Sequence, residues 1–414
     1  MLPGLEKIVT VRRGDRRIGW TGAREGETQQ FLDDRTQGAS QIARVAWFAP
    51  CYSSVVGWIY RLASGNRPRR TCADLQSPNV LDKHLFPREK PCAGWITPSV
   101  IGVLGLDLEA YSREHVCQPI TGFRCGMVGG DTVQVKYDHT ISYGIRRWEF
   151  DDYLVRRCGA RHFLGNPVST ITHANGLWHV NEEFAAPMLV GAGGHFCPVA
   201  RLLGAHTNVQ APVVTAQEIE FSVSDEQLDQ GTIEADIPEL FFCRDLQGYG
   251  WCFRKGNYLN IGLGRLDNRH LSSHVAEFCG SLQSTRKIAC EIPLHFRGHA
   301  YQLYQGMGPK LFDDGVLLVG DAAGLACPQS GEGIRPAIES GLIAADVINE
   351  ARGCYRPAQL TKYADAIRHT FGKPRRHDAF NWLPERWLHA IGTRLLASPW
   401  FIRRVVMDRW FLHC

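Results

Sequence analysis

The sequence lacks the features that mark several large classes of protein. Its 414 residues carry 46 basic and 42 acidic side chains, a formal net charge of only +4, and no aromatic and basic recognition pattern accompanies that small excess, so nucleic-acid binding is not predicted. None of the 14 cysteines stands in a CxxC pair and no secretory leader precedes them, which favours a cytoplasmic chain with free thiols. The 16 histidines form no metal-binding motif, so no metal is expected, and the lack of a GxSxG elbow argues against a nucleophilic hydrolase.

Long hydrophobic runs and repeats are also scarce. The uncharged run that comes nearest to a membrane span, residues 45–60, is too short for one and contains Pro50. No fixed-period repeat is found, which argues against a solenoid or a propeller. The tail from Trp382 to Cys414 alternates aromatic and aliphatic residues with arginine. It predicts an amphipathic helix packed on its own domain, with a membrane-surface helix as the alternative.

The most informative segment is GVLLVGDAAGLACPQSGEGIRPAIESGLIAADVI, residues 315–348. A short apolar strand, residues 316–319, leads into Gly320 and Asp321, and such a strand end presents its carboxylate at the edge of a sheet. The loop of residues 328–333 leads into a helix that we expect to start near Ile334, with its amides directed at any partial negative charge. This pattern predicts a site for a hydroxyl-rich ligand.

The same segment resembles the second flavin-contacting motif of FAD enzymes of the aromatic-hydroxylase superfamily, and within it the geranylgeranyl reductase family. The resemblance implies that Asp321, after Gly320, binds the ribityl chain of FAD. It further implies that Gly331, Glu332 and Gly333 lie against the pyrimidine end of the flavin.

Three further segments support the resemblance. LDKHLFPREKPCAGWITP, residues 81–98, is similar to the second strand end of the family and the loop that follows it. The resemblance gives Asp82 a role in binding the adenosine ribose and Arg88 a phosphate or flavin contact. It places Cys92 near the isoalloxazine ring. The candidate proton donors for catalysis are then Cys92 and a water molecule. A buried, inert thiol is the alternative for Cys92.

MLVGAGGHFCPVAR, residues 188–201, resembles the strand and GADG turn of the family, which gives Gly191 and Gly193 cofactor-binding roles. Gly193 stands where the family has Asp, a departure that leaves the approach of NAD(P)H open. RRWEFDDYLVRRCGA, residues 146–160, has apolar residues spaced for an amphipathic helix and resembles the RxxFDxxL helix of the superfamily. Arg147 is either a flavin contact or a solvated or capping arginine.

GYGWCFRKGNYLNIGLGRL, residues 248–266, alternates as a half-buried strand, turns at residues 255–257 and returns, which predicts a hairpin. It resembles the YxWxFPKG strand of geranylgeranyl reductases, whose aromatic residues line the substrate cavity. Tyr249, Trp251 and Phe253 are then the candidate substrate-contacting residues, with ordinary core packing as the alternative for each.

The N-terminal part departs from the family. A strand and GxGxxG turn should precede Asp82 by about 20 to 25 residues, yet Gly57 there is followed by the bulky residues Trp58, Ile59 and Tyr60, which would block close approach of a pyrophosphate. Two explanations stay open. Residues from about 58 to 79 are an out-of-frame translation of the glycine loop, or the N-terminus is genuinely divergent and binds FAD weakly or not at all.

Together these observations predict an α/β protein. Residues 1–78 are an atypical segment in place of the GxGxxG unit, and residues 79–204 and 305–350 form a discontinuous, Rossmann-like FAD-binding domain. A mixed-sheet substrate domain spans residues 205–304 with part of 116–144, and residues 351–414 form C-terminal helices.

The resemblance implies an FAD-dependent oxidoreductase that takes electrons from NAD(P)H and reduces a carbon-carbon double bond of an apolar, prenyl-like substrate. A monooxygenase acting on an aromatic or apolar small molecule is the first alternative, because the fold permits both reactions. A degenerate, non-catalytic homologue is the second.

Overall fold

The computed structural model describes strands Gln41–Ile42 and Ala46–Phe48 and residues 78–205, 212–267, 269–306, 310–372 and 385–412. The chain comprises two compact units, Met1–Ser40 and Gln41–Cys414. All described residues belong to the second unit, which is the one treated below.

A six-stranded sheet forms the first layer, in the order β19-β20-β13-β2-β3-β9. Its strands run parallel except for β19, which pairs antiparallel with β20. Strands β20, β13 and β3 are buried along their whole length, as expected of a parallel sheet covered on both faces. The strands are β19 (Phe312–Asp313), β20 (Val316–Leu318), β13 (Leu189–Gly191), β2 (Ala46–Phe48), β3 (Asn79–Asp82) and β9 (Arg161–Leu164).

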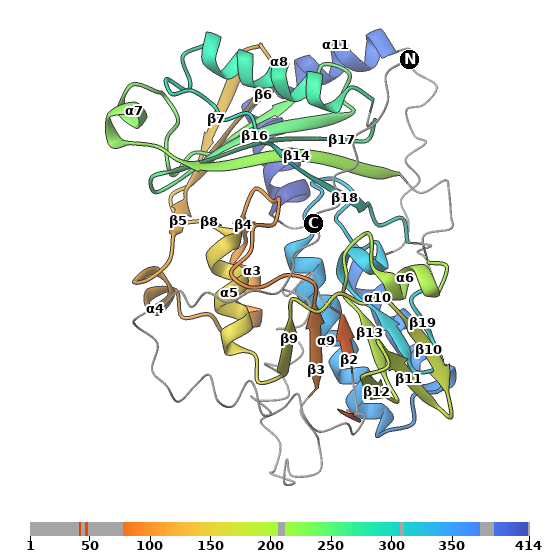
Figure 1. The fold of residues 1–414 in the computed structure, drawn as a ribbon. Coiled ribbons are helices and arrows are strands. Elements are labelled where there is room, and N and C mark those ends of the chain that lie inside the picture. The colour runs from red at the N-terminus through yellow and green to blue at the C-terminus, as the bar shows by residue number, and fades with distance from the viewer. Residues whose placement is uncertain are drawn as a thin grey trace, which may run out of the picture. The chain divides into compact units, whose positions relative to one another are not determined.

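Helices cover this sheet and share its core. Helices α9 and α10 pack against each other beside it (Figure 1), and Leu317 and Ile338 belong to one hydrophobic cluster with Tyr363. The helices associated with this part of the chain are α3 (Pro98–Leu104), α4 (Leu108–Ser112), α5 (Arg147–Arg157), α6 (Pro198–Leu202), α9 (Ile334–Ala351) and α10 (Pro357–Phe371).

A seven-stranded mixed sheet forms the second layer, in the order β18-β14-β17-β16-β15-β6-β7. Helix α8 (Leu271–Ser284) covers one of its faces (Figure 1); Leu259, Ile261 and Leu263 alternate toward it and pack in one cluster with Phe278. The strands are β18 (Arg297–Gln302), β14 (Val213–Ser222), β17 (Tyr258–Arg265), β16 (Gly248–Lys255), β15 (Glu239–Phe242), β6 (Gly122–Met127) and β7 (Thr132–Lys136).

Smaller elements complete the described fold. They are a four-stranded sheet of β1 (Gln41–Ile42), β12 (Phe184–Ala186), β11 (Leu177–Val180) and β10 (Ile171–Ala174); a three-stranded sheet of β4 (Trp95–Ile96), β8 (Ser142–Ile145) and β5 (Cys117–Ile120); and helix α7 (Asp225–Asp229).

The C-terminal tail packs on the second sheet. It contains α11 (Glu385–Leu396), α12 (Pro399–Phe401) and a π-helix, η4 (Ile402–Phe411). Leu396, Ile402 and Phe411 are buried in one cluster with Phe123 and Trp251. The tail therefore buries its apolar face within its own unit, as the sequence predicted.

The α/β fold class is confirmed. The predicted strand before Gly320, the helix start at Ile334 and the hairpin of β16 and β17 are all present. The domain ranges stay predictions. The reading-frame hypothesis concerns residues from about 58 to 79, of which residues 58–77 lie outside the described ones.

One strand was not predicted. The three residues of β2 pair in parallel with both β3 and β13, so they occupy the central position of the sheet. The first strand was expected next to Gly57, because a glycine turn should follow the first strand of such a fold. A three-residue strand with Trp47 at its centre carries no such signal.

Candidate functional site

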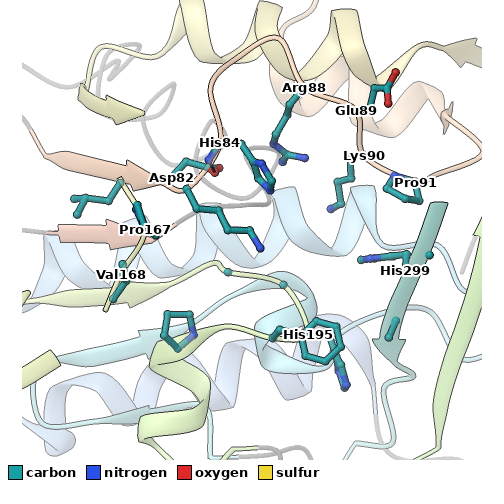
Figure 2. Close-up of a pocket in the computed structure, with 18 of the residues that line it drawn as sticks. Asp82, His84, Arg88, Glu89, Lys90, Pro91, Pro167, Val168, His195 and His299 are labelled. Atoms are coloured by element: carbon teal, nitrogen blue, oxygen red, sulfur yellow. Dashed lines mark hydrogen bonds between the residues drawn. The ribbon is translucent and has the colours of Figure 1, made fainter. Parts of the chain in front are cut away.

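A pocket of about 420 Å³ lies at the carboxyl ends of β3 and β13. This edge of a parallel sheet is where doubly wound folds bind their ligands. Asp82, Arg88 and Lys90 lie along one side of the pocket, with His195 opposite and His299 at one end (Figure 2). We call it the first pocket.

Asp82 ends β3 and faces the first pocket with an unsatisfied oxygen. Its Oδ1 accepts a hydrogen bond from the backbone amide of His84 at 2.8 Å. Its Oδ2 is buried and has no hydrogen-bond partner. Burial raises the pKa of Asp82 to about 6, although the His84 amide and the charge of Arg88 oppose the rise. A buried acceptor without a partner is costly in a folded protein and is most simply explained by a ligand that donates to it.

Arg88 and Arg147 share the carboxylate of Asp151. Arg147 donates two hydrogen bonds to Asp151, each 2.8 Å long, and Arg88 lies 3.5 Å from the same carboxylate. All three side chains are buried. This triad joins the loop after β3 to helix α5. Arg147, for which the sequence left a solvated or capping role open, is thus a buried ion-pair partner that also lines the next pocket.

The glycines at and after the end of β13 meet two different structural requirements, close packing and a positive φ. A Cβ at Gly191 would come within 2.6 Å of Leu318, and one at Gly193 within 2.8 Å of the Cys197 backbone, so both allow close packing of strand and helix. Gly194 has a positive φ of 68° and open space where a Cβ would stand. Gly193 and Gly194 line the first pocket.

A second pocket adjoins the first, and Lys90, Pro91 and His299 line both. Asp321, in the short 3-10 helix η2 (Gly320–Ala323), belongs to its wall. The Oδ2 of Asp321 lies 3.4 Å from Nε2 of His299. Burial alone would raise the pKa of Asp321, but the hydrogen bond with His299 and the charges of Lys90 and Arg147 lower it. Asp321 is therefore an ionised acceptor at neutral pH.

The turn before α9 closes one side of the second pocket. Gly331 has a positive φ of 69°, and a Cβ there would come within 2.4 Å of the Tyr301 hydroxyl. A Cβ at Gly333 would approach Oδ1 of Asp321 to 3.1 Å. The carboxylate of Glu332 is buried, and its Oε2 lies 3.6 Å from Nε of Arg335. Burial raises the pKa of Glu332 to about 7, although the charge of Arg335 opposes the rise.

Aromatic side chains of β16 form the opposite wall. Tyr249 and Trp251 line the second pocket; the Tyr249 hydroxyl donates to the Ser330 carbonyl at 2.5 Å. Phe253, on the same face of the strand, is 1% exposed and packs in the core against Trp95 and Phe123. The substrate-contacting roles of the three aromatics stay predictions.

Cys92 lies on the loop between the second pocket and a third, polar pocket. Its Sγ accepts a hydrogen bond from the Gly94 amide at 3.4 Å, and the residue is half-buried. Its proposed catalytic role stays a prediction. Across the described ranges, no group of three or more His, Cys, Asp or Glu side chains is arranged to hold a metal ion.

Several residues of these pockets were not predicted from the sequence. His299 and Tyr301 come from β18, Glu218 from β14 and Asn260 from β17. Two glutamates at positions 218 and 220, spaced for one face of a strand, were the available signal.

Comparison with known proteins finds relatives in sequence and neighbours in fold. No family model matches the chain. A digeranylgeranylglycerophospholipid reductase of Methanocaldococcus jannaschii is 28% identical over 238 residues, covering 54% of this chain and 59% of that protein, which is less than two thirds of the relative's length. A menaquinone reductase of Mycobacterium tuberculosis is 28% identical over 293 residues, covering 65% of this chain and 70% of that protein.

Solved structures agree on the fold. A geranylgeranyl bacteriochlorophyll reductase-like protein of Thermoplasma acidophilum superposes with a TM-score of 0.66 at 17% identity, covering 86% of this chain and 91% of the other. The chain is thus similar in sequence to proteins named as reductases and shares the fold of a geranylgeranyl reductase-like protein. A flavin-dependent halogenase superposes with a TM-score of 0.57 at 18% identity over 80% of this chain and 63% of the halogenase. The resemblance inferred from the sequence is thereby confirmed.

The residues present fit an FAD. The buried Oδ2 of Asp82 has no hydrogen-bond partner and stands at the edge of the sheet where doubly wound folds bind dinucleotides, and Asp321, whose pKa is lowered, lines the second pocket. The segment in which a pyrophosphate-binding turn would stand, residues 49–77, lies outside the described residues. Among the helices that the structure describes, none is both long and apolar enough to cross a membrane.

Proposed function

We propose that this chain is an FAD-dependent reductase of carbon-carbon double bonds in an apolar, prenyl-like substrate. One observation carries the proposal: two pockets meet at Lys90, Pro91 and His299, one with a ribose-type carboxylate and the other with aromatic walls. A dinucleotide cofactor that extends from the first pocket into the second would have its reactive ring under Tyr249 and Trp251. The names of the relatives support a reductase of isoprenoid compounds.

The cofactor-binding roles follow from the acceptors and the backbone. Asp82 would accept hydrogen bonds from the two hydroxyls of the adenosine ribose, because its Oδ2 has no other partner. Asp321 would accept from the ribityl chain, and its low pKa keeps it ionised for that purpose. Gly331 and Gly333 would bring backbone close to the ring, and a side chain at either position would press on Tyr301 or Asp321 of the same pocket. FAD, once bound and reduced, supplies a hydride to an acceptor carbon.

The chain itself supplies orientation and a dry cavity. Trp95, Tyr249, Trp251 and Tyr301 surround the second pocket with aromatic rings, which favours an apolar substrate and excludes water. A proton must complete the reduction of the double bond, and Cys92 at the pocket wall is one candidate donor. We infer NAD(P)H as the reductant on the family resemblance alone.

The deciding experiment is a flavin-retention assay followed by anaerobic turnover. Purified protein is mixed with FAD and passed through a gel-filtration column, and the visible spectrum is recorded. Retained flavin that NAD(P)H bleaches, together with geranylgeraniol gaining two hydrogens by mass spectrometry, supports the proposal. Loss of all flavin on the column contradicts it and favours the degenerate homologue, and turnover that occurs only with oxygen favours the monooxygenase.

A further inference from the structure

A buried polar cluster lies on the face of the seven-stranded sheet that carries Tyr249 and Trp251. It comprises Glu218 and Glu220 of β14, Asn260 of β17 and Lys255 of β16. Glu220 pairs with Asn260 across the two antiparallel strands, and Lys255 pairs with Tyr258 at the hairpin end. This cluster is separate from the residues predicted to hold the cofactor.

Asn260 connects the cluster to the aromatic wall. Its Oδ1 accepts a hydrogen bond from the indole of Trp251 at 2.7 Å. Its Nδ2 donates to Oε2 of Glu218 at 2.8 Å and to the Cys92 carbonyl at 3.2 Å. Glu218 is thus fixed by an amide whose own orientation is set by a pocket residue.

The two glutamates have opposite electrostatic environments. Glu220 lies 2.6 Å from Nζ of Lys255 and 2.9 Å from Nε of Arg146; burial alone would raise its pKa, but these two cations lower it. Burial dominates at Glu218 and raises its pKa to about 7, against the charge of Lys255 and the hydrogen bond from Asn260. Two neighbouring carboxyl groups with divergent pKa values are the pattern of an assigned acid and a permanent anion.

Glu218 is positioned to exchange protons on two sides. It lines the second pocket, beside Cys92 and Trp251, and also the third pocket, a polar cavity of about 400 Å³. Groups of this polar cavity can return a proton to a carboxyl group that has lost one. On the side of the third pocket the titratable and charged residues are Lys255, Glu220, Arg146, Arg147, Glu89, Lys90, His295 and Arg297. On the side of the second pocket they are Cys92, Tyr249, His299, Tyr301, Asp321 and Glu332.

We propose that Glu218 is the general acid of the reduction, a proposal that rests on the function proposed above. The hydride supplied by reduced FAD forms a carbon-hydrogen bond at one carbon of the double bond. The O–H bond of Glu218 breaks, and its proton forms the carbon-hydrogen bond at the other carbon. The resulting carboxylate is stabilised by Lys255 and Asn260, and it is reprotonated through the third pocket.

The first test needs no cofactor or substrate. Infrared difference spectra of the protein between pH 5 and pH 9 report carboxylic acids through their carbonyl stretch. Because Asp82 and Glu332 titrate in the same range, wild type is compared with Glu218→Gln, which keeps the size and polarity of the side chain. Loss of one titrating band near neutral pH in Glu218→Gln supports the proposal. Identical spectra mean that Glu218 does not change protonation state between pH 5 and pH 9 and overturn it.

The second test separates proton delivery from cofactor binding. FAD-loaded protein is reduced with dithionite under anaerobic conditions and mixed with geranylgeraniol, and reoxidation of the flavin is followed by absorbance. We expect Glu218→Gln to slow reoxidation by about 10²-fold or more while its FAD affinity stays within about twofold of wild type. Glu218→Asp should restore part of the rate with a shifted pH profile.

The comparison with Cys92 decides between the two candidate donors. If Cys92→Ala loses the rate and Glu218→Gln keeps it, Cys92 is the donor and the proposal is wrong. If wild type itself does not reduce geranylgeraniol, the proposed function fails for this substrate class, and the infrared result still decides whether Glu218 holds a proton at neutral pH.

Discussion

His299 directs its imidazole Nε2 to the carboxylate of Asp321 at 3.4 Å. His299 lines both the first and the second pocket, and Asp321 lines the second. The pair therefore lies where the adenosine end of a bound dinucleotide would give way to its ring end. Because the hydrogen bond with His299 helps to lower the pKa of Asp321, the imidazole keeps this acceptor ionised.

Replacement of Asp321 by asparagine should weaken FAD binding by about 10- to 100-fold. Hydrogen bonds to a charged group contribute about 1.5–3 kcal/mol, and the amide would lose that charge with little change of shape. Fluorescence titration of FAD measures the dissociation constant. Asp314→Asn, an exposed carboxylate just before β20, is the matched control and should bind as wild type does. Equal affinities for the two variants would remove Asp321 from the site.

The carboxylate of Asp82 should lower the free energy of unfolding above about pH 6 while it strengthens the binding of FAD. Burial raises the pKa of Asp82 from the ordinary 3.8 to about 6 in the folded chain, so the folded state holds the proton more tightly than the unfolded state does. The free energy of unfolding therefore falls as the pH rises from about 4 to about 6, and the loss persists above pH 6. Asp82→Asn should be more stable than wild type at pH 8 by about 1–3 kcal/mol, with the difference vanishing near pH 4.

Urea unfolding of the cofactor-free proteins at pH 4 and pH 8 measures this difference. The same variant should bind FAD about tenfold less tightly, because an amide replaces an acceptor-only carboxylate beside the ribose. A variant that is less stable at both pH values would show that the Asp82 carboxylate is held by the protein itself.

Local patterns allowed much of the fold to be predicted. The strand, GD turn and helix of residues 315–348 are continuous in sequence, and the local preferences of their residues favour the same strand, turn and helix that the fold contains. The start of α9 at Ile334 and the turn between β16 and β17 were therefore readable. The central strand β2 was not, because three residues without a glycine turn leave no periodic signal.

The cluster around Glu218 was invisible for a different reason. Glu218, Asn260 and Lys255 come from three strands, and only the pairing register brings their side chains together. A sequence pattern reports which face of a strand a residue occupies, and it does not report which strand lies beside it. The sharing of Asp151 by Arg88 and Arg147 depends in the same way on a loop meeting a distant helix.

The shared carboxylate makes Asp151 critical for folding. Asp151 is fully buried and pairs with two buried guanidinium groups, so Asp151→Asn removes the carboxylate that both of them share. We expect a loss of about 3–5 kcal/mol in the free energy of unfolding, measured by urea titration. Asp152 on the same helix pairs with Arg156, whose side chain is 74% exposed, and Asp152→Asn should cost less than about 1 kcal/mol. Similar losses for the two variants would contradict the buried network.

Substitution of Phe411 tests whether the C-terminal tail supports the wall of the second pocket. The Phe411 ring stacks on Trp95 at 5.5 Å and meets Tyr249 edge-on at 5.6 Å, and both partners line the second pocket. Phe411→Ala should lower the free energy of unfolding by about 3–5 kcal/mol and raise the KM for an apolar substrate, since both wall residues lose a support.

Trp400 provides the control for that tail. It is 68% exposed, so Trp400→Ala should change stability by no more than about 0.5 kcal/mol. A tail that instead served to dock on lipid would give the reverse result. Trp400→Ala would then reduce sedimentation with vesicles containing anionic lipid, and Phe411→Ala would leave unfolding unchanged. Urea titration and vesicle sedimentation of the two variants separate these cases, because a buried ring and an exposed ring cannot exchange roles within one packing arrangement.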